Sequence, residues 1–283
     1  MTTAKETAEH RLPTRQTLLP DLPAFDATAL DHGTRDALAE LLLAMADDEF
    51  ICGFWDSEWT GIAPLLEEDV AFSSLAQDEI GHARLLYEMY GRLTGADPDR
   101  TAFLRAPEEY RHARLLDHPR TDWAFSICRR WLYDTADAIR LAALASSSFK
   151  PLAEVVAKIR REERYHLMHL DAWMRRLAAH DGEPRAKLVA ALDTLAPDAL
   201  TVFTPLAGSA GLVLAGVLAQ PMTVLAERWS LEVGGMLAQM GLPKMAFGRP
   251  SADGRDHSQP ADSFRWLWGE FTSVARSEEG VEW

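Results

Sequence analysis

The segment QDEIGHA, residues 77–83, places Glu79 three residues before His82. A second segment, EERYH at residues 162–166, places Glu163 three residues before His166. Residues three apart on a helix lie on the same face, and here both pairs interrupt apolar stripes that are expected to face a core. The stripes consist of Phe72, Leu75, Ala76, Ala83 and Leu86 around the first pair, and Val156, Ile159 and Leu170 around the second.

Two further helical segments carry a single acid on an apolar face. Glu49 is one, and Asp134 is the other. A buried carboxylate is unfavourable unless it is paired, protonated or bound to a metal. The two faces consist of Leu42, Met45 and Cys52 in the first segment, and Ile127, Ala138 and Leu141 in the second.

The four segments form an internal repeat. The single acid precedes the Glu-x-x-His pair by 30 residues in the first half (49 to 79) and by 29 in the second (134 to 163). One acid from each of two helices, and Glu-x-x-His from each of two others, is the ligand plan of carboxylate-bridged di-iron bundles. Oxygen donors with two imidazoles and no thiolate favour iron or manganese. We therefore expect two metal ions, held by Glu49, Glu79, His82, Asp134, Glu163 and His166.

Other interpretations of these residues exist. A third Glu-x-x-His match, Glu109 and His112, lies in an irregular segment bounded by prolines and is interpreted as chance. The acids could instead be neutralised in structural ion pairs, for which the nearby candidates are Arg160, Arg161 and Arg164. Asp137 is a rival ligand one turn from Asp134. Its face also carries Arg130 and Arg140, so a surface ion pair is expected for Asp137.

Helical periodicity dominates the chain after residue 30. Helices are expected at about 36–55, 65–93, 121–147 and 151–180, with further helices near 184–196, 221–240 and 262–276. Residues 101–120 and 248–260 are expected to be irregular, and residues 1–30 to form an extended arm. No segment alternates long enough to predict a strand. The sequence thus predicts an all-α domain over residues 31–283, with a four-helix core and additional C-terminal helices.

Composition narrows the class of protein. The 283 residues include 29 basic and 43 acidic side chains, for a net charge of -14, which disfavours nucleic acid and anionic membrane as partners. Two cysteines cannot form a disulfide framework and fit a reducing cytoplasm, and the first ten residues lack the apolar core of a signal peptide. Residues 199–226 carry no charge, but glycine and proline interrupt them. They favour a buried helix–loop–helix or a subunit contact over a membrane span.

Three motifs carry a family resemblance. ADDEFICGFWDSEW (46–59), APLLEEDVA (63–71) and QDEIGHARLL (77–86) resemble the bacterial phenylacetyl-CoA epoxidase family of phenylacetate catabolism. The resemblance implies a ferritin-like fold and a pairing of a catalytic di-iron subunit with a related structural subunit that lacks the ligands. DSEW, LEEDVA, the chain length and the C-terminal region look like the structural subunit, whereas QDEIGH and EERYH look like the catalytic one. The catalytic pattern falls on the same six residues named above.

This resemblance implies a non-haem di-iron monooxygenase subunit that works with a homologous oxygenase subunit in an oligomer. It would use O2 to epoxidise the ring of an aryl-acetyl-CoA. Glu79 and Glu163 would bridge or flank the two irons, and His82 and His166 would each cap one iron. Glu49 and Asp134 would be terminal carboxylates. The expected catalytic carboxylates are Glu49, Glu79 and Glu163. Electrons would come from a separate reductase, because the chain has no cysteine cluster and no dinucleotide fingerprint. The alternatives are a non-catalytic scaffold subunit and a ferritin-like ferroxidase.

Two sets of side chains near the proposed site have less specific signals. The aromatic residues are interpreted as core rather than as a substrate pocket; they are Phe54, Trp55, Trp59, Phe72, Trp131 and Tyr133. Coenzyme A would require basic groups for its phosphates, and the candidates are Arg84, Arg129 and Arg130.

Overall fold

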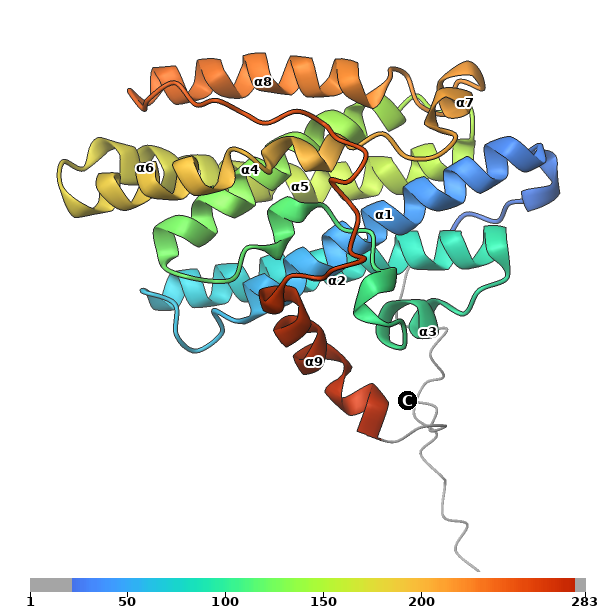
Figure 1. The fold of residues 1–283 in the computed structure, drawn as a ribbon, viewed down its shortest axis with the longest axis horizontal. Coiled ribbons are helices and arrows are strands. Elements are labelled where there is room, and N and C mark those ends of the chain that lie inside the picture. Colours follow the sequence, from blue (N-terminus) through green and yellow to red (C-terminus); the bar gives the residue numbers. More distant parts are fainter. Residues whose placement is uncertain (1–21, 278–283) are drawn as a thin grey trace, which may run out of the picture.

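The computed structural model describes residues 22–277, and within that range it contains helices and no strands (Figure 1). The all-α class is therefore confirmed, and most of the expected N-terminal arm lies outside the described residues. The α-helices are α1 (His32–Ser57), α2 (Leu66–Thr94), α3 (Pro98–Phe103), α4 (Trp123–Leu144), α5 (Lys150–Ala179), α6 (Glu183–Leu195), α7 (Ser209–Leu214), α8 (Met222–Gln239) and α9 (Asp262–Ser277). Short 3-10 turns are η2 (Ala27–Ala29), η3 (Pro107–Glu109), η4 (Arg114–Asp117) and η5 (Ala199–Phe203).

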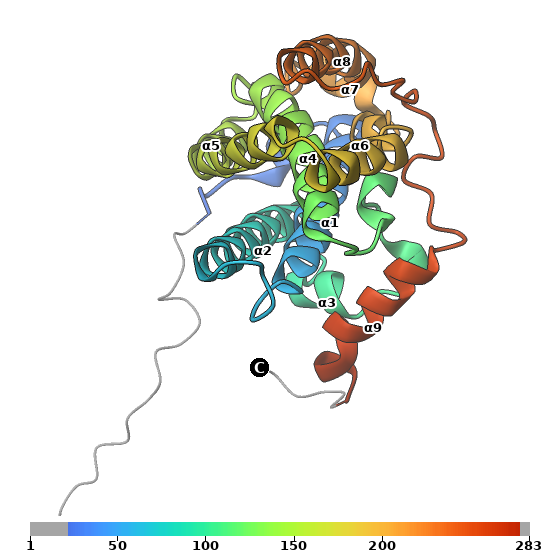
Figure 2. The same ribbon diagram turned by 90° about the vertical axis from the view of Figure 1, so that its left-hand side faces the viewer.

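Two long hairpins make the core of the molecule. Helix α1 packs along α2, and α4 packs along α5. Figure 2, which looks toward one end of the bundle, shows the α1–α2 hairpin below the α4–α5 hairpin. Residues 95–122 connect one hairpin to the other and contain α3, η3 and η4. This is the ferritin-like four-helix arrangement that the sequence predicts, with helix ends within a few residues of the expected ones.

Capping side chains begin two of the four core helices. Asp31 accepts a hydrogen bond from the Thr34 amide at the start of α1. Asp122 accepts one from the Phe125 amide at the start of α4. Each satisfies an amide that has no partner inside the helix. These caps fix where each helix begins, and thus which turn carries Glu49 and Asp134.

The apolar stripes expected from the sequence form the core between the hairpins. Met45, Phe72, Ile127, Val156 and Ile159 are completely buried, and among the stripe residues only Ala138 is half-buried. Removing one such large side chain from water contributes roughly 1.5–3 kcal/mol. The acids and imidazoles on the same faces are thereby carried into the interior.

Helix α1 buries three consecutive acids, and each points in a different direction. Asp47 accepts hydrogen bonds from Tyr87 and from Arg105 in the connection. Asp48 is held by Arg140 of α4 and by Arg255 of the C-terminal segment, at 2.6 Å and 2.8 Å. Glu49, the third acid, faces the space between the four core helices. Successive helical residues point about 100° apart. These three acids therefore connect α1 to neighbours on three different sides.

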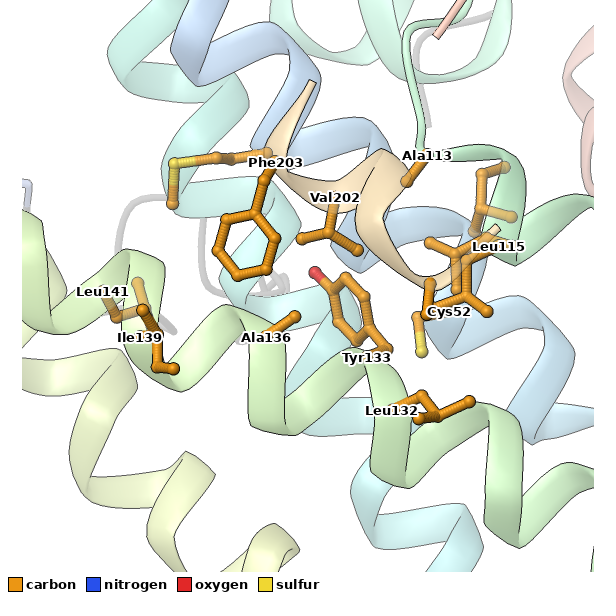
Figure 3. Close-up of a cluster of buried hydrophobic side chains, with 14 of the residues drawn as sticks. Cys52, Ala113, Leu115, Leu132, Tyr133, Ala136, Ile139, Leu141, Val202 and Phe203 are labelled. Atoms are coloured by element: carbon orange, nitrogen blue, oxygen red, sulfur yellow. The ribbon is translucent and has the colours of Figure 1, made fainter. Parts of the chain in front are cut away.

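The uncharged segment 199–226 packs against the bundle. It forms η5, α7 and the start of α8, and Phe203, Leu212 and Leu218 are buried. Figure 3 shows Val202 and Phe203 beside Tyr133 and Ala136 of α4. Within residues 22–277, no helix has the length and apolar character needed to cross a membrane. The segment is thus buried in part, and its exposed side chains, Leu214 among them, leave the expectation of a subunit contact open.

Candidate metal centre

The four core helices bring the six predicted ligands together in the interior. They form two groups, and within each group one potential ligand atom from every residue lies within 4.8 Å of the others. Glu163 belongs to both groups. The first group is Glu49, Glu79, His82 and Glu163, and the second is Asp134, Glu163 and His166. All six side chains are buried, none with more than 4% of its surface exposed. The repeat inferred from sequence spacing therefore describes a real cluster.

Glu163 lies between the two imidazoles. Its Oε1 atom is 3.4 Å from His82 Nδ1 and 3.1 Å from His166 Nδ1. Glu49 Oε2 is 3.5 Å from His82 Nδ1, and Glu79 Oε1 is 3.2 Å from His166 Nδ1. Each imidazole thus faces two carboxylates, one of them shared. Glu163 is therefore the carboxylate that the two ligand groups share.

Each histidine is oriented by an acid from the opposite hairpin. His82 of α2 contacts Glu162 of α5 through Nε2 at 2.7 Å, and His166 of α5 contacts Asp78 of α2 through Nε2 at 3.1 Å. Both contacts leave Nδ1 turned toward the cluster. A carboxylate on the outer nitrogen fixes the ring and increases the basicity of the inner one. The two acids immediately precede the glutamates of the Glu-x-x-His pairs.

Many inward-facing atoms of the cluster have no hydrogen-bond partner among the described residues. Buried polar atoms are nearly always satisfied, so a group of unsatisfied ones indicates an ion or another ligand. They are Glu49 Oε2, Glu79 Oε2, His82 Nδ1, Asp134 Oδ2 and both carboxylate oxygens of Glu163. Oxygen and imidazole donors of this kind fit iron or manganese.

Arg130, which the sequence reasoning placed elsewhere, lies inside the second ligand group. Its Nε donates to Asp134 Oδ1 at 2.7 Å, its Nη1 donates to Asp56 Oδ2 at 2.6 Å, and its Nη2 contacts Glu79 Oε1. Nη2 is also 3.1 Å from His166 Nδ1. A buried guanidinium therefore neutralises part of the acidic cluster.

The buried acids perturb one another's protonation. Burial and the neighbouring Glu79 raise the pKa of Glu49 well above its usual range. Burial also raises the pKa of Asp134, against the effect of Arg130. Burial would raise the pKa of Glu79 as well, but Arg130 and hydrogen bonds hold it well below its usual range. Buried carboxylates with opposed pKa shifts are typical of functional sites.

Asp137 corrects one expectation. It pairs with Arg140 at 2.5 Å as predicted, but both side chains are buried, so the pair is not on the surface. Burial raises the pKa of Asp137 to about 6, with Glu163 and Glu79 contributing and Arg140 opposing. Arg140 also binds Asp48 of α1 at 2.6 Å, so the pair lies in the interior between α4 and α1 rather than on the surface.

The arginines proposed as structural partners are also corrected. Arg160, Arg161 and Arg164 are exposed on α5, and the cation among the acids is Arg130. Two of the three coenzyme A candidates are buried, namely Arg129 and Arg130. Arg84 pairs with Glu88 on the surface and lines a depression between α2 and α5, together with Asp78, His82, Lys158 and Glu162.

Most of the aromatic residues interpreted as core are buried. Trp55, Trp59, Phe72, Trp131 and Tyr133 have 6% or less of their surface exposed, and Phe54 packs partly buried against them. Tyr133 has an additional contact, because its hydroxyl donates to Glu49 Oε1 at 2.9 Å. It therefore positions one of the predicted ligands.

The Glu109 and His112 pair contributes nothing to the cluster. His112 instead stacks on His257 with ring centroids 3.9 Å apart, and its Nε2 contacts Asp117 at 2.9 Å. His257 Nε2 donates to the backbone carbonyl of His112 at 2.9 Å. This group joins the connection to the C-terminal segment, away from the centre of the bundle.

The bundle and its buried residues define a class: a ferritin-like helical protein with a carboxylate–histidine centre. The family model for the phenylacetic acid catabolic protein matches residues 23–283, and the chain belongs to that family. The chain is 28% identical to one subunit of the 1,2-phenylacetyl-CoA epoxidase of Escherichia coli (strain K12) over 197 residues, which are 69% of this chain and 79% of that relative. It is 27% identical to another subunit of the same enzyme over 121 residues, which are 43% of this chain and 39% of that relative.

Proposed function

We propose that this chain is a metal-dependent subunit of a multicomponent monooxygenase in phenylacetate catabolism. With a homologous subunit and a separate reductase, it would insert one atom of O2 into the aromatic ring of an aryl-acetyl-CoA. The family and the two epoxidase subunits that the chain resembles support a role in this pathway. The two free, buried cysteines are compatible with the reducing cytoplasm in which we place the protein.

One observation carries the proposal: the unpartnered oxygen and nitrogen atoms that converge at the centre of the bundle. The residues that would hold iron, or manganese in its place, are Glu49, Glu79, His82, Asp134, Glu163 and His166. When bound, the metal would supply the electrons and the open coordination position that O2 activation requires. The sequence expectation of two ions requires both ligand groups to be available at once.

The chain's own residues have separate tasks in this proposal. Asp78 and Glu162 keep the Nδ1 atoms of His166 and His82 directed inward. Glu49, Glu79 and Glu163 are the carboxylates closest to the reacting centre, and Tyr133 holds Glu49 in place. The apolar stripes around them exclude water. The second oxygen atom would leave as water, with two protons from solvent and two electrons that the reductase delivers by way of the metal.

A non-catalytic supporting subunit is the second candidate function. Arg130 favours it, because a guanidinium already contacts Glu79, Asp134 and His166. In that role the chain would stabilise a catalytic homologue, and its own cluster would hold its helices together. Both candidates predict a complex with a homologous subunit, and they differ in where the oxidation takes place.

Reconstitution of the complex separates the two candidates. The chain, its homologous subunit and the reductase are combined with aryl-acetyl-CoA under 18O2, and incorporation of one labelled oxygen is measured by mass spectrometry. Glu163→Gln in this chain should abolish incorporation if the chain is catalytic. Glu154→Gln, an exposed glutamate of the same helix, is the matched control and should have no effect. Full incorporation with Glu163→Gln would instead place the chemistry in the homologous subunit.

A further inference from the structure

The two ligand groups of the metal centre differ in their surroundings. In the group formed by Glu49, Glu79, His82 and Glu163, the atoms Glu49 Oε2, His82 Nδ1 and Glu163 Oε1 have no hydrogen-bond partner among residues 22–277. His82 Nδ1 lies 3.5 Å from Glu49 Oε2 and 3.4 Å from Glu163 Oε1. Ligand atoms about 2.1 Å from a shared tetrahedral ion are about 3.4 Å apart. The two distances from His82 Nδ1 therefore match the spacing of ligand atoms around one ion.

The group formed by Asp134, Glu163 and His166 is already in contact with a cation. Arg130 approaches it from the preceding turn of α4 and contacts Asp134 and His166. It also contacts Oε1 of Glu79, a member of the first group, whose other oxygen, Oε2, has no hydrogen-bond partner among the described residues. Its guanidinium is completely buried. An arginine side chain stays protonated in proteins and can only donate hydrogen bonds. It therefore contributes a permanent positive charge at this position.

A metal ion and this guanidinium compete for the same ligand atoms. An ion bound to His166 Nδ1 would lie about 2.1 Å from it, in the space that Nη2 borders at 3.1 Å. It would also share Glu79 Oε1 and Asp134 with the nitrogens of Arg130. Two cations at this separation repel strongly in a buried environment. The second metal position is open only when Arg130 is elsewhere.

The other contacts of Arg130 keep it where it is. Nη1 donates to Asp56 Oδ2 at 2.6 Å and lies 3.3 Å from Cys52 Sγ, both on α1. Asp56 is itself almost completely buried and would lose its ion-pair partner if Arg130 moved. Breaking a buried ion pair by removing one partner is strongly destabilising. Asp56 thus anchors the guanidinium in the cluster.

We propose that Arg130 takes the place of the second metal ion, so that this chain binds one ion, at Glu49, Glu79, His82 and Glu163. The inference rests on the proposed metal-dependent function and changes its stoichiometry from two ions to one. One metal ion and one arginine would together neutralise the negative charge of the buried carboxylates. Removal of the arginine should convert the site into one that binds two ions.

The test compares metal stoichiometry in three full-length proteins loaded anaerobically with Mn(II): the wild type, Arg130→Gln and Arg129→Gln. Arg129 is the matched control, because it is the adjacent buried arginine but donates to the carbonyl of His118, outside the cluster. Plasma emission should give about one ion per chain for the wild type and the control, and about two for Arg130→Gln. Electron paramagnetic resonance should show an isolated Mn(II) ion in the first two and a spin-coupled pair in the third.

Arg130→Gln alone leaves Asp56 buried without its partner and could misfold. The double variant Arg130→Gln/Asp56→Asn removes both members of this ion pair and so keeps the test valid. It should also bind about two ions as a coupled pair. Two coupled ions in the wild type would overturn the inference and leave the proposed function intact. One ion in every protein would also overturn it, because Arg130 would then not determine the count. No ion in any protein would overturn the metal-dependent function as well.

Discussion

At the scale of single residues, the cluster depends on pairs of neighbours with different tasks. Glu79 and Glu163 face the centre, whereas the preceding acids, Asp78 and Glu162, reach across to the histidine of the other hairpin. Each half of the repeat therefore has two consecutive acids, Asp78-Glu79 in the first and Glu162-Glu163 in the second. The orienting residues thus had a sequence signal as regular as that of the ligands themselves.

Removal of one orienting acid should weaken metal binding without removing a ligand. Glu162→Ala leaves His82 free to rotate and makes its inner nitrogen less basic. Loss of such a partner typically lowers metal affinity 10- to 100-fold, and because Glu162 is partly exposed we expect about 10-fold. Competition with a chromophoric chelator measures the change. Glu154→Ala on the same helix is the control, and equal affinities in the two variants would contradict the prediction.

The six clustered residues could be found from sequence because each interrupts an apolar stripe with a charged or imidazole group. Arg130 could not be placed in the same way. A long arginine side chain reaches several directions from one backbone position, and helix periodicity assigned Arg130 to the face of Asp137. The structure pairs Asp137 with Arg140 and directs Arg130 to Asp134, Asp56 and Glu79.

At the scale of elements, the close approach of α1 and α2 sets the distance between Glu49 and Glu79. Gly53 lies one turn after Glu49, where a Cβ would be 3.0 Å from both the Ala76 carbonyl oxygen and Glu79 Cβ. The absence of a side chain at this position allows the two helices to pack closely. The turn of α2 that carries Glu79 is therefore held directly against α1.

Gly53→Ala should separate the two helices at the level of the cluster. The added methyl group meets backbone and Cβ atoms that cannot turn away, so we expect the free energy of unfolding to fall by about 1–3 kcal/mol. Gly81→Ala on α2 is the matched control. A Cβ there meets nothing within 4 Å, and the better helix former should raise stability by about 0.5–1 kcal/mol. Urea unfolding measures both, and stabilisation by Gly53→Ala would be the contrary result.

The long helices could be predicted because their apolar period extends over several turns, and the observed ends differ little from the expected ones. The short elements could not. Helices α3 and α7 have six residues each, too few for a periodic pattern to distinguish them from a loop. Their positions are determined by packing on the long helices, which acts between residues far apart in sequence.

At the scale of the whole molecule, the C-terminal segment closes the bundle on the side of α1 and the connection. Arg255 binds Asp48 of α1, and Phe271 of α9 packs on Phe50 at a centroid distance of 5.1 Å. His257 stacks on His112 of the connection. Figure 1 shows α9 below the bundle, where it contacts α3. These contacts join residues more than 140 positions apart, which no local sequence pattern reveals.

This closure should weaken in acid because of His257. Burial and the neighbouring His112 lower the pKa of His257 to about 4, although Asp117 opposes them. In the unfolded chain the imidazole titrates near 6.5. Between these values the unfolded chain binds more protons than the folded one, so the free energy of unfolding falls as pH falls from about 6.5 to 4. From pH 7 to pH 5 this residue should account for a loss of about 2 kcal/mol.

Urea unfolding of the wild type and His257→Gln at pH 7 and pH 5 measures that contribution. Glutamine keeps an N–H donor for the His112 carbonyl but does not titrate. The loss of stability on acidification should therefore be about 2 kcal/mol smaller in the variant than in the wild type. Equal losses in the two proteins would show that His257 does not stay neutral in the folded state.

The most direct measurement of the central claim is the metal content of the purified chain, before and after anaerobic loading with Fe(II), determined by plasma emission. The account predicts tightly bound iron or manganese in the wild type and its loss in the double variant Glu79→Ala/Glu163→Ala, which removes carboxylates from both ligand groups. Loaded wild type without metal, or metal retained in the double variant, would contradict the assignment of this cluster as a metal centre.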